Sequence, residues 1–515
     1  MLKDGKILIG KAGEKEITLL PSMLNRHGLI AGSTGTGKTV TLKVIAESLS
    51  ELGVPTFICD IKSDLSGMIV EGDLSGIQER LDSMGIEGFE TRKYPVHFFD
   101  VSQKLGHALR SDIDQYDRFL LSRVLGLSEA QEGVLNIIFE WAQDFDPDEN
   151  GEGLDVNDIE DLEACCDYVS DHAEEISARY GNVTKQSVAA IKRKLLQLKA
   201  EQGGYLFGLP ALEYDDLFET QNGLGVMSIL ECEKLFQDQL AYSTFLVGLL
   251  DGLYNHLPEV GDLEKPKLVL FFEESHLMFK DAPKRLVSMI EQTVKLIRSK
   301  GVSVFFCTQT PTDIPASVLA QLSNRIQHSL RAYTPAELEV VKKTAKSFRE
   351  NPELNTEEEL TSMKVGTALV SVLDEDGAPT IVERTKILPP KSSMNKADES
   401  LIISCINSDG LSEVYDDKYG DDNDDDYDAA RELADFKKFE EEEKERIAEE
   451  ERIAKEEEAL RKKEEKEEEA RIRREEREAE KNKNRLAKKA RNKIENELMN
   501  IGLRSAKKIL KKLLK

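Results

Sequence analysis

Aromatic residues, long apolar runs and export signals are all scarce in this chain of 515 residues. Aromatic residues make up 6% of it, with a single Trp, and no stretch interleaves aromatic with basic residues as base-stacking surfaces do. No run approaches the length of about 18 apolar residues that a membrane helix needs, and the opening MLKDGKILIG lacks the apolar centre of a signal peptide. We therefore expect no membrane-spanning segment, no secretion and a cytoplasmic location.

Metal-binding and disulfide patterns are missing as well. No CxxC spacing occurs, so the six cysteines predict reduced thiols rather than a zinc site or a disulfide framework. His97, His107 and His276 show no metal-ligand spacing, and we expect them to be surface residues or to be satisfied within the fold. The cysteines are Cys59, Cys165, Cys166, Cys232, Cys307 and Cys405.

Charge is abundant and unevenly distributed. Charged residues make up 33% of the chain and hydrophobic residues 40%, and the formal net charge is -28. This acidity argues against a nucleic-acid surface that covers the whole chain, although it leaves room for a local basic channel. Residues 1 to about 390 have a globular composition, whereas the remainder is polar and highly charged.

Strand and helix patterns alternate through most of the globular part, which predicts a parallel α/β sheet. Between residues 107 and 200 three amphipathic helical segments follow one another without a strand, so this region is predicted to be a helical insertion. ALVSVL and TIVERTKIL are expected to form a closing hairpin around Gly377. The predicted divisions are 1–27, short N-terminal strands; 28–106, first part of the core; 107–205, helical insertion; 206–392, second part of the core; 393–428, acidic linker; and 429–515, charged helical tail.

The tail has three segments of different charge. EVYDDKYGDDNDDDYD, at 413–428, looks too charged to pack, and residues 429–480 carry Glu-then-base pairs at the spacing that supports a helix, such as Glu442–Arg446, Glu451–Lys455, Glu458–Lys462 and Glu469–Arg473. Their apolar residues keep no steady heptad, so a solvated single helix is favoured over a coiled coil. From Lys481 onward the charge inverts, with 13 Lys and Arg against two Glu, and the chain ends in the amphipathic SAKKILKKLLK.

Residues Gly32–Thr39, GSTGTGKT, fit the phosphate-loop pattern G-x-x-x-x-G-K-[ST] between a predicted strand and a predicted helix. Glycines let backbone N–H groups converge on phosphates, Lys38 reaches the β and γ oxygens, and the Thr39 hydroxyl binds Mg²⁺. The chain is therefore predicted to bind a nucleotide. The candidate binding residues are Gly32, Ser33, Thr34, Gly35, Thr36, Gly37, Lys38, Thr39 and Val40.

Three short patterns resemble GTPase motifs, but the sequence around each pattern argues against a GTPase. Asp64–Gly67 matches DxxG but comes four residues after Asp60, which ends the second predicted strand. Asn395–Asp398 matches NKxD but lies in the predicted linker, and Ser505–Lys507 matches SAK in a basic helix. Asp60 itself either supports the phosphate site or caps a helix.

KLVLFFEESH, at 267–276, supplies the second half of a hydrolysis site. Five apolar residues predict a buried strand, and Glu273 and Glu274 follow at its carboxyl end, where parallel sheets bind ligands. We expect Glu273 to hold Mg²⁺ through water and Glu274 to polarise the water that attacks the γ-phosphate.

A third strand, Val302–Cys307, leads to Gln309, which is placed to sense the γ-phosphate. An arginine that neutralises transition-state charge is also expected. Arg298 is the first candidate, from its own or a neighbouring subunit, and Arg325 and Arg331 are its rivals.

Long stretches of the sequence resemble the bacterial HerA-like ATPases of the HerA/FtsK superfamily. They are GLIAGSTGTGKTVTL, LSEAQEGVLNIIF, LPEVGDLEKPKLVLFFEESHLMF, IRSKGVSVFFCTQTPTDIPASVLAQLSNRIQHSLRAYTP and VGTALVSVLDEDGAPTIVER, and the resemblance spans about residues 1–392. It implies a RecA-like P-loop core that binds ATP and Mg²⁺. It also implies roles for Gln309 as the sensor and Arg298 as the arginine of the IRSKG segment, and an oligomer, often a hexameric ring, that moves double-stranded DNA.

Two departures from the family stand out. Glu273 occupies a position where the family usually has Asp, and the tail beyond about residue 400 exceeds the resemblance. Only about 27 residues precede the phosphate-loop strand, so the nuclease-docking barrel of HerA itself is not carried over.

Three functions remain open at this stage. The first is an oligomeric ATPase, possessing helicase or translocase activity, that acts on DNA. The second is an ATP-dependent switch or scaffold that acts on a protein or membrane partner through the tail, whose partner the sequence does not identify. The third is a structural role with degenerate ATPase activity. For the basic end of the tail, docking within the oligomer, an anionic membrane and nucleic acid are all compatible.

Overall fold

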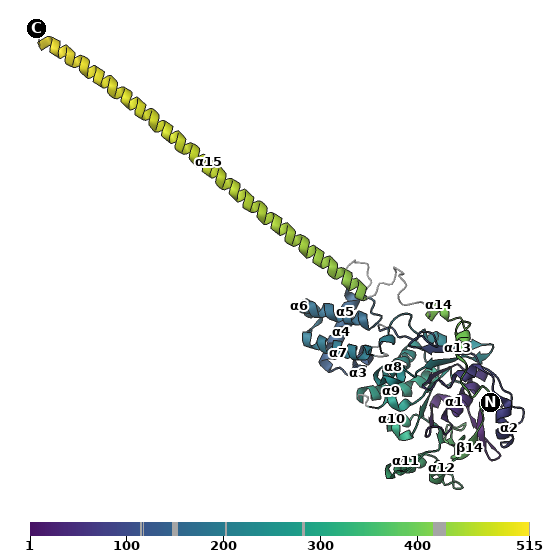
Figure 1. The fold of residues 1–515 in the computed structure, drawn as a ribbon. Helices are drawn as coiled ribbons and strands as arrows, with labels where there is room; N and C mark the ends of the chain where they lie inside the picture. Colours follow the sequence, from purple (N-terminus) through teal and green to yellow (C-terminus); the bar gives the residue numbers. More distant parts are fainter. Residues whose placement is uncertain are drawn as a thin grey trace. The chain divides into compact units, whose positions relative to one another are not determined.

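The computed structural model describes residues 1–113, 116, 118–146, 153–200, 203–280, 284–415 and 429–513 (Figure 1). The described chain forms two compact units, Met1–Leu433 and a second unit that begins at Ala434. The first unit holds the sheet and all the predicted site residues.

Parallel strands form the centre of a twelve-stranded sheet in the first unit. Their side chains are almost entirely buried because helices cover both faces, which explains the continuous apolar runs in the sequence. β6 and β12 were missed by the sequence analysis. The parallel strands, in spatial order, are β12 (Asn324–His328), β4 (Gly28–Ala31), β11 (Val302–Thr308), β10 (Leu268–Phe272), β5 (Thr56–Asp60), β9 (Met227–Glu231) and β6 (Val96–Asp100).

Antiparallel strands extend the sheet beyond β12. The hairpin predicted around Gly377 is confirmed, and the N-terminal strands pair with it through Lys11 and Lys386 rather than forming a separate piece. The antiparallel strands are β13 (Thr367–Ser371), β14 (Glu383–Ile387), β2 (Lys6–Ala12), β1 (Leu2–Lys3) and β3 (Lys15–Leu19), and a separate short hairpin joins β7 (Thr220–Gln221) to β8 (Leu224–Gly225).

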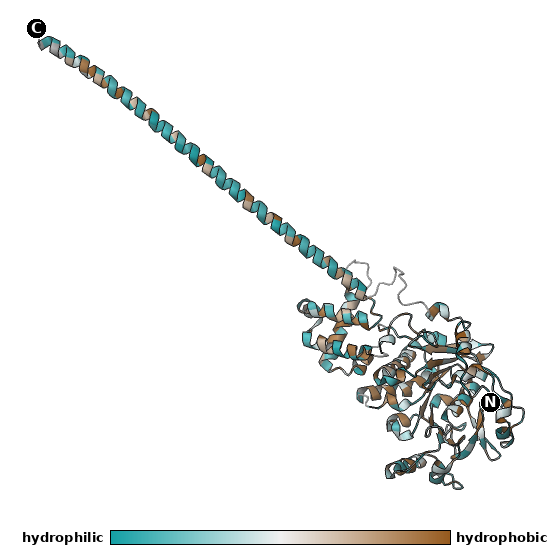
Figure 2. Cartoon of the chain, viewed as in Figure 1, coloured by the Kyte–Doolittle hydropathy of each residue, from teal (hydrophilic) through white to brown (hydrophobic). Residues whose placement is uncertain are grey.

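Helices pack on the sheet through apolar faces. α1 buries Leu42, Ile45 and Leu49 completely, and α8 is buried along most of its length between the sheet and its neighbours. Apolar residues, brown in Figure 2, accordingly concentrate in the first unit. These helices are α1 (Lys38–Glu51), α2 (Leu74–Asp82), α8 (Gln239–His256), α9 (Lys284–Ile297), α10 (Ala316–Leu319), α11 (Pro335–Ala345) and α12 (Thr356–Ser362).

Five helices lie between residues 118 and 199, inside the range predicted for the insertion, and cluster together in Figure 1. Reciprocal capping boxes at Ser128 and Asp158 start two of them. Trp141 stacks on Tyr168 with ring centroids 4.9 Å apart, which gives this region an apolar centre of its own. The helices are α3 (Arg118–Val124), α4 (Glu129–Asp144), α5 (Ile159–Asp171), α6 (Ala173–Tyr180) and α7 (Lys185–Lys199).

The linker predicted at 393–428 is wrong over its described part, because the chain packs there. The Ser393 N–H donates to the Val70 carbonyl at 2.9 Å, and the Ser393 carbonyl accepts a hydrogen bond from the buried Lys43 of α1 at 2.6 Å. Two helices follow, α13 (Glu399–Ile406) and α14 (Ser412–Tyr415), and Tyr415 is fully buried although it lies in the run predicted to be too charged to pack. Residues 416–428 of that run lie outside the described residues.

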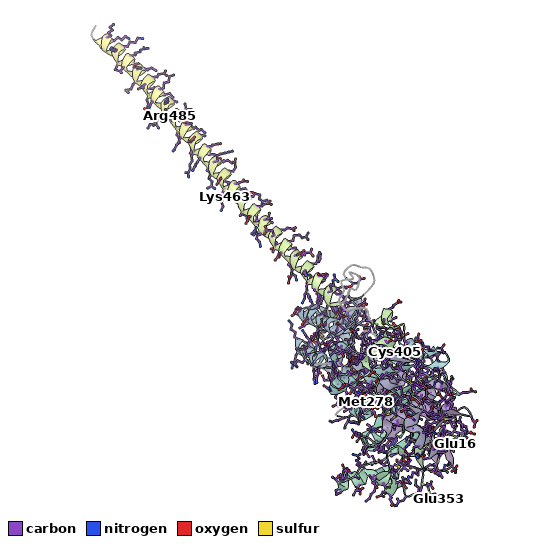
Figure 3. The ribbon with its side chains drawn as sticks, turned by 45° about the vertical axis from the view of Figure 1, so that its right-hand side comes forward. Glu16, Met278, Glu353, Cys405, Lys463 and Arg485 are labelled. Carbon is purple, nitrogen blue, oxygen red and sulfur yellow. The ribbon has the colours of Figure 1, made fainter. Side chains whose placement is uncertain are left out.

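α15 (Ala429–Leu513) begins on the first unit, where the Ala430 N–H donates to the Asp161 carboxylate at 3.0 Å. The second unit is the rest of this single helix, in which Lys463 and Arg485 extend away from the helix axis (Figure 3). Three of the four predicted Glu–base pairs are confirmed, whereas Arg446 pairs with Glu443 instead of Glu442. The confirmed pairs are Glu451–Lys455, Glu458–Lys462 and Glu469–Arg473.

None of the described helices is both long enough and apolar enough to cross a lipid bilayer.

Candidate active site

The phosphate loop joins β4 to α1 at the carboxyl edge of the parallel strands. Gly32, Gly35 and Gly37 have φ angles of +151°, +76° and +117°, which side-chain-bearing residues rarely adopt. A Cβ at Gly32 would lie 2.5 Å from the Cβ of His328, so the loop also needs glycine there for space. The sequence pattern G-x-x-x-x-G-K-T therefore reflects both conformation and packing.

Two neighbouring strands anchor the start of the loop. The Gly32 N–H donates to the Thr308 carbonyl at 3.2 Å, and the Ser33 N–H donates to the Ser329 carbonyl at 3.0 Å. Thr34 and Gly35, in the turn after them, are exposed, and a Cβ added at Gly35 meets no atom within 4 Å. An anion can approach the N-terminus of α1 through this turn.

Lys38 is the first residue of α1, and its ammonium group folds back over the loop. Its Nζ donates to the Gly32 carbonyl at 2.7 Å and lies 3.4 Å from the Ser33 carbonyl. Burial lowers the Lys38 pKa, and the charge of Glu274 partly opposes this effect. The cation is thus held at the loop, where the sequence analysis placed it. Thr39 follows in the first helical turn and is half-buried.

His328 and Gly366 contact the phosphate loop, and the sequence analysis assigned neither of them a role. His328 ends β12, is fully buried and shares a 2.9 Å hydrogen bond with the Thr41 hydroxyl. Burial lowers its pKa to about 4, with a further contribution from Lys38, so the imidazole is neutral. The Gly366 N–H donates to the Thr36 carbonyl at 3.1 Å. No local pattern signals these contacts, because both residues lie hundreds of positions from the loop.

Glu273 and Glu274 follow β10, which is separated from β4 by β11 alone. Glu273 is 5% exposed, and burial raises its pKa to about 8, helped by the charges of Asp60 and Asp64. A cation beside Glu273 would offset the cost of burying the charged carboxylate, so Glu273 fits a role in binding Mg²⁺. Among the described residues no group of three or more His, Cys, Asp or Glu forms a metal site by itself, which is compatible with Mg²⁺ that takes most ligands from phosphate and water.

Glu274 has a φ of +44°, a left-handed conformation that is unusual for a residue with a side chain. This backbone turn directs its carboxylate toward three neighbours. Gln309 Nε2 and His276 Nδ1 each lie 3.4 Å from Oε2, and Lys62 Nζ lies 3.9 Å from Oε1. The structure thus brings Glu274 and Gln309 together and places His276 beside them.

Asp60 supports the site indirectly. Its carboxylate accepts hydrogen bonds from the backbone N–H groups of Lys62 (3.1 Å) and Leu65 (2.8 Å), so it shapes the loop that carries Lys62. Burial raises its pKa to about 7. His97 and His107 lie beside acidic partners, Glu219 and Asp409, and not at this site.

Arg298 lies at the opposite edge of the sheet. It precedes β11, whose seven residues span roughly 20 Å, whereas Gln309 follows the far end of that strand. Its guanidinium pairs with Asp262 at 3.1 Å. A catalytic role for Arg298 within its own subunit is therefore wrong, and only the role in a neighbouring subunit stays a prediction.

The two alternative candidates, Arg325 and Arg331, lie at different positions relative to the phosphate loop. Arg325, near the start of β12, donates three hydrogen bonds to backbone carbonyls, including that of Leu322 at 3.1 Å, and so has a structural role. Arg331 follows the carboxyl end of β12, is exposed, and its backbone N–H donates to the Ser33 hydroxyl at 3.0 Å. Of the three arginines, Arg331 alone adjoins the phosphate loop.

A parallel sheet with a phosphate loop after β4, an acidic pair after β10 and a polar residue, Gln309, after the intervening β11 defines a P-loop nucleoside triphosphatase with a RecA-like fold. The chain belongs to the helicase HerA-like C-terminal family, whose profile matches residues 6–510. It is accordingly an ATPase of the P-loop class.

Solved structures that resemble this chain have low sequence identity to it. The plasmid coupling protein TrwB in complex with the GTP analogue GDPNP is 13% identical, with a TM-score of 0.52 over 78% of this chain and 92% of TrwB. An unbound form of this bacterial conjugative coupling protein is also 13% identical, with a TM-score of 0.50 over 77% and 92%. VirB4 of Thermoanaerobacter pseudethanolicus is 16% identical, with a TM-score of 0.46 over 75% and 97%. A comparison with curated protein sequences gives no match.

Proposed function

We propose that this protein is an ATP-driven motor that works as an oligomeric ring, a hexamer by family analogy, and translocates or remodels double-stranded DNA. The observation that carries the proposal is the contact of Gln309 with Glu274 one strand away from the phosphate loop. This arrangement joins a γ-phosphate sensor to a catalytic base, as a motor that couples hydrolysis to movement requires.

The residues divide the chemistry of hydrolysis among them. The loop N–H groups and Lys38 bind the phosphates. Thr39, directly, and Glu273, through water, would hold Mg²⁺, which would supply positive charge to neutralise the phosphates. Glu274 takes the proton of the attacking water, and Gln309 orients Glu274 and that water. ATP with Mg²⁺ is the proposed pair because TrwB has been solved with an ATP analogue and with ADP and Mg²⁺.

The oligomeric part of the proposal rests on the arginines. Arg298 lies about the length of one strand from the nucleotide site of its own subunit. If Arg298 acts in hydrolysis, it must therefore reach the γ-phosphate bound by a neighbouring subunit. An arginine supplied between subunits ties hydrolysis in one subunit to the position of the next.

The test is ATP hydrolysis with and without double-stranded DNA, on protein whose oligomeric mass has been measured. We expect DNA to stimulate turnover and the stimulation to fall steeply with added salt, because phosphate contacts release counterions. Hydrolysis that ignores DNA, but changes when residues 400–515 are deleted, would instead favour a switch or scaffold that acts through the tail.

Two variants test the site itself. Lys38→Ala is expected to abolish nucleotide binding, because the loop loses its cation. Glu274→Gln is expected to keep nucleotide affinity within about threefold and to lower turnover by at least about 100-fold, since the amide cannot accept the proton. Normal turnover by Glu274→Gln would show that another group is the base.

A further inference from the structure

Between Leu486 and Ile501, α15 exposes an apolar face. Leu486, Ile494, Leu498 and Ile501 are 58–67% exposed, and their spacing places them within about 120° of the helix circumference. Side chains of this size are rarely so exposed along one face of a helix unless a partner covers them.

Basic residues flank this apolar face. Arg485, Lys489, Lys493 and Lys507 fall outside the apolar arc, by about 20–100° around the helix, and beyond Ile501 the arc itself turns basic with Arg504, Lys508 and Lys512. Residues 481–515 contain 13 Lys and Arg and two Glu, a net charge of +11, in a chain whose total is -28. The covering partner must therefore be anionic.

A second copy of this segment does not meet that requirement. Side-by-side pairing of two such segments, parallel or antiparallel, would bring +11 against +11. Pairing along the preceding part of α15 is also unsupported, because its large apolar residues are few and irregular: Ile447, Ile453, Leu460 and Ile472 are separated by six, seven and twelve positions.

Nucleic acid would neutralise the cations and leave the apolar face in water, since phosphate contacts need no apolar surface. The interface of an anionic lipid bilayer accommodates both features, because acyl chains receive the aliphatic side chains while headgroups pair with Lys and Arg. We propose that the basic end of α15, residues 486–513, docks on the surface of an anionic membrane and lies in the plane of its headgroups without crossing it.

The experiment is sedimentation of the full-length protein with vesicles of phosphatidylcholine that contain roughly one third phosphatidylglycerol, compared with phosphatidylcholine alone. Neither nucleotide nor DNA is added, so failure of the motor proposal leaves this test unaffected. We expect binding to the anionic vesicles, weakening with salt, and at least tenfold weaker binding to the neutral ones.

Two variants separate the apolar contribution from the charge. The triple substitution Ile494→Ser, Leu498→Ser and Ile501→Ser keeps every charge and is expected to weaken vesicle binding by about 100-fold. The matched control is Ile447→Ser, Ile453→Ser and Leu460→Ser, which removes three exposed aliphatic residues of the same helix, among acidic neighbours, and should bind as the unmodified protein does.

The charge variant is Lys489→Gln, Lys493→Gln and Lys507→Gln. It is expected to weaken binding to anionic vesicles by roughly 100-fold, since each surface cation contributes about fivefold in affinity. Circular dichroism of each variant checks that its helix content is retained.

Several results would overturn the proposal. They are the absence of binding to anionic vesicles, equal binding by the apolar triple variant, and a change in oligomeric mass in that variant without a change in vesicle binding, which would identify a second copy as the partner. DNA binding that depends on the three lysines but not on the apolar residues, with no vesicle binding, would identify nucleic acid instead.

Discussion

Gly32→Ala is expected to weaken nucleotide binding, because the added methyl group would clash with residues packed against the phosphate loop. The added Cβ would lie 2.5 Å from the Cβ of His328 and 2.9 Å from the Thr36 hydroxyl, and the φ of +151° is unfavourable for alanine. Overpacking of this kind costs about 1–3 kcal/mol, and a strained backbone adds about 1–3 kcal/mol. His328 is fully buried and bonded to Thr41, so the loop rather than the histidine must move.

The matched control is Gly35→Ala in the same loop. Gly35 has a φ of +76°, but its added Cβ meets no atom within 4 Å. The expected cost of Gly35→Ala is therefore only that of holding alanine in a left-handed backbone conformation, about 1 kcal/mol. Titration with a fluorescent ATP analogue gives the affinity, and thermal unfolding gives the stability. We expect at least about a 30-fold loss of affinity for Gly32→Ala, corresponding to about 2 kcal/mol, and a loss of no more than about fivefold for Gly35→Ala. Equal affinities for the two variants would refute the inference that His328 fixes the shape of the loop.

The remaining predictions concern the arginine and a buried histidine. Arg298→Ala is expected to lower turnover by about 1000-fold while nucleotide affinity is kept, and an equimolar mixture with Glu274→Gln should regain activity, because mixed oligomers join an intact arginine to an intact base. Full turnover by Arg298→Ala would leave Arg331 as the candidate, to be tested by Arg331→Ala. Burial lowers the pKa of His27 to about 4, so the unfolded chain, with its pKa near 6.5, binds the proton more tightly. The contribution of His27 to stability is therefore complete above pH 6.5 and is lost as the pH falls toward 4, by about 3 kcal/mol. Because His328, whose pKa is also lowered to about 4, adds a similar loss, a pH series of chemical denaturation should show a loss about 3 kcal/mol smaller in His27→Gln than in the unmodified protein.

Local pattern alone predicted the parts of the site that depend on neighbouring residues. GSTGTGKT carries its own glycines and cation, and LVLFFEE carries a buried strand together with the acids at its end, so each half of the site is encoded within ten residues. The helical tail was equally predictable, because a solvated helix is stabilised mainly by pairs three or four residues apart, as in Glu458–Lys462 at 2.6 Å.

Local sequence patterns could not predict the contacts between segments that lie far apart in the chain. β12, NRIQH, has too few apolar residues to read as a strand and is fixed by pairing with β4 and β13 on its two sides. The segment taken for a linker packs because Lys43, 350 positions earlier, donates a hydrogen bond to the Ser393 carbonyl. Composition describes a segment's own preference for water and carries no information about a partner elsewhere in the chain.

The sequence by itself determined that the chain has a phosphate loop, an acidic pair and a charged helical tail, since these depend on residue types at short spacing. The tertiary structure alone decided which residues surround them. It set His328 and Gly366 against the loop, His276 beside Glu274, and Arg298 at the far edge of the sheet. The physical reason is that strand order in a parallel sheet is chosen by burial of whole apolar faces, and that order determines which strand ends meet at the site.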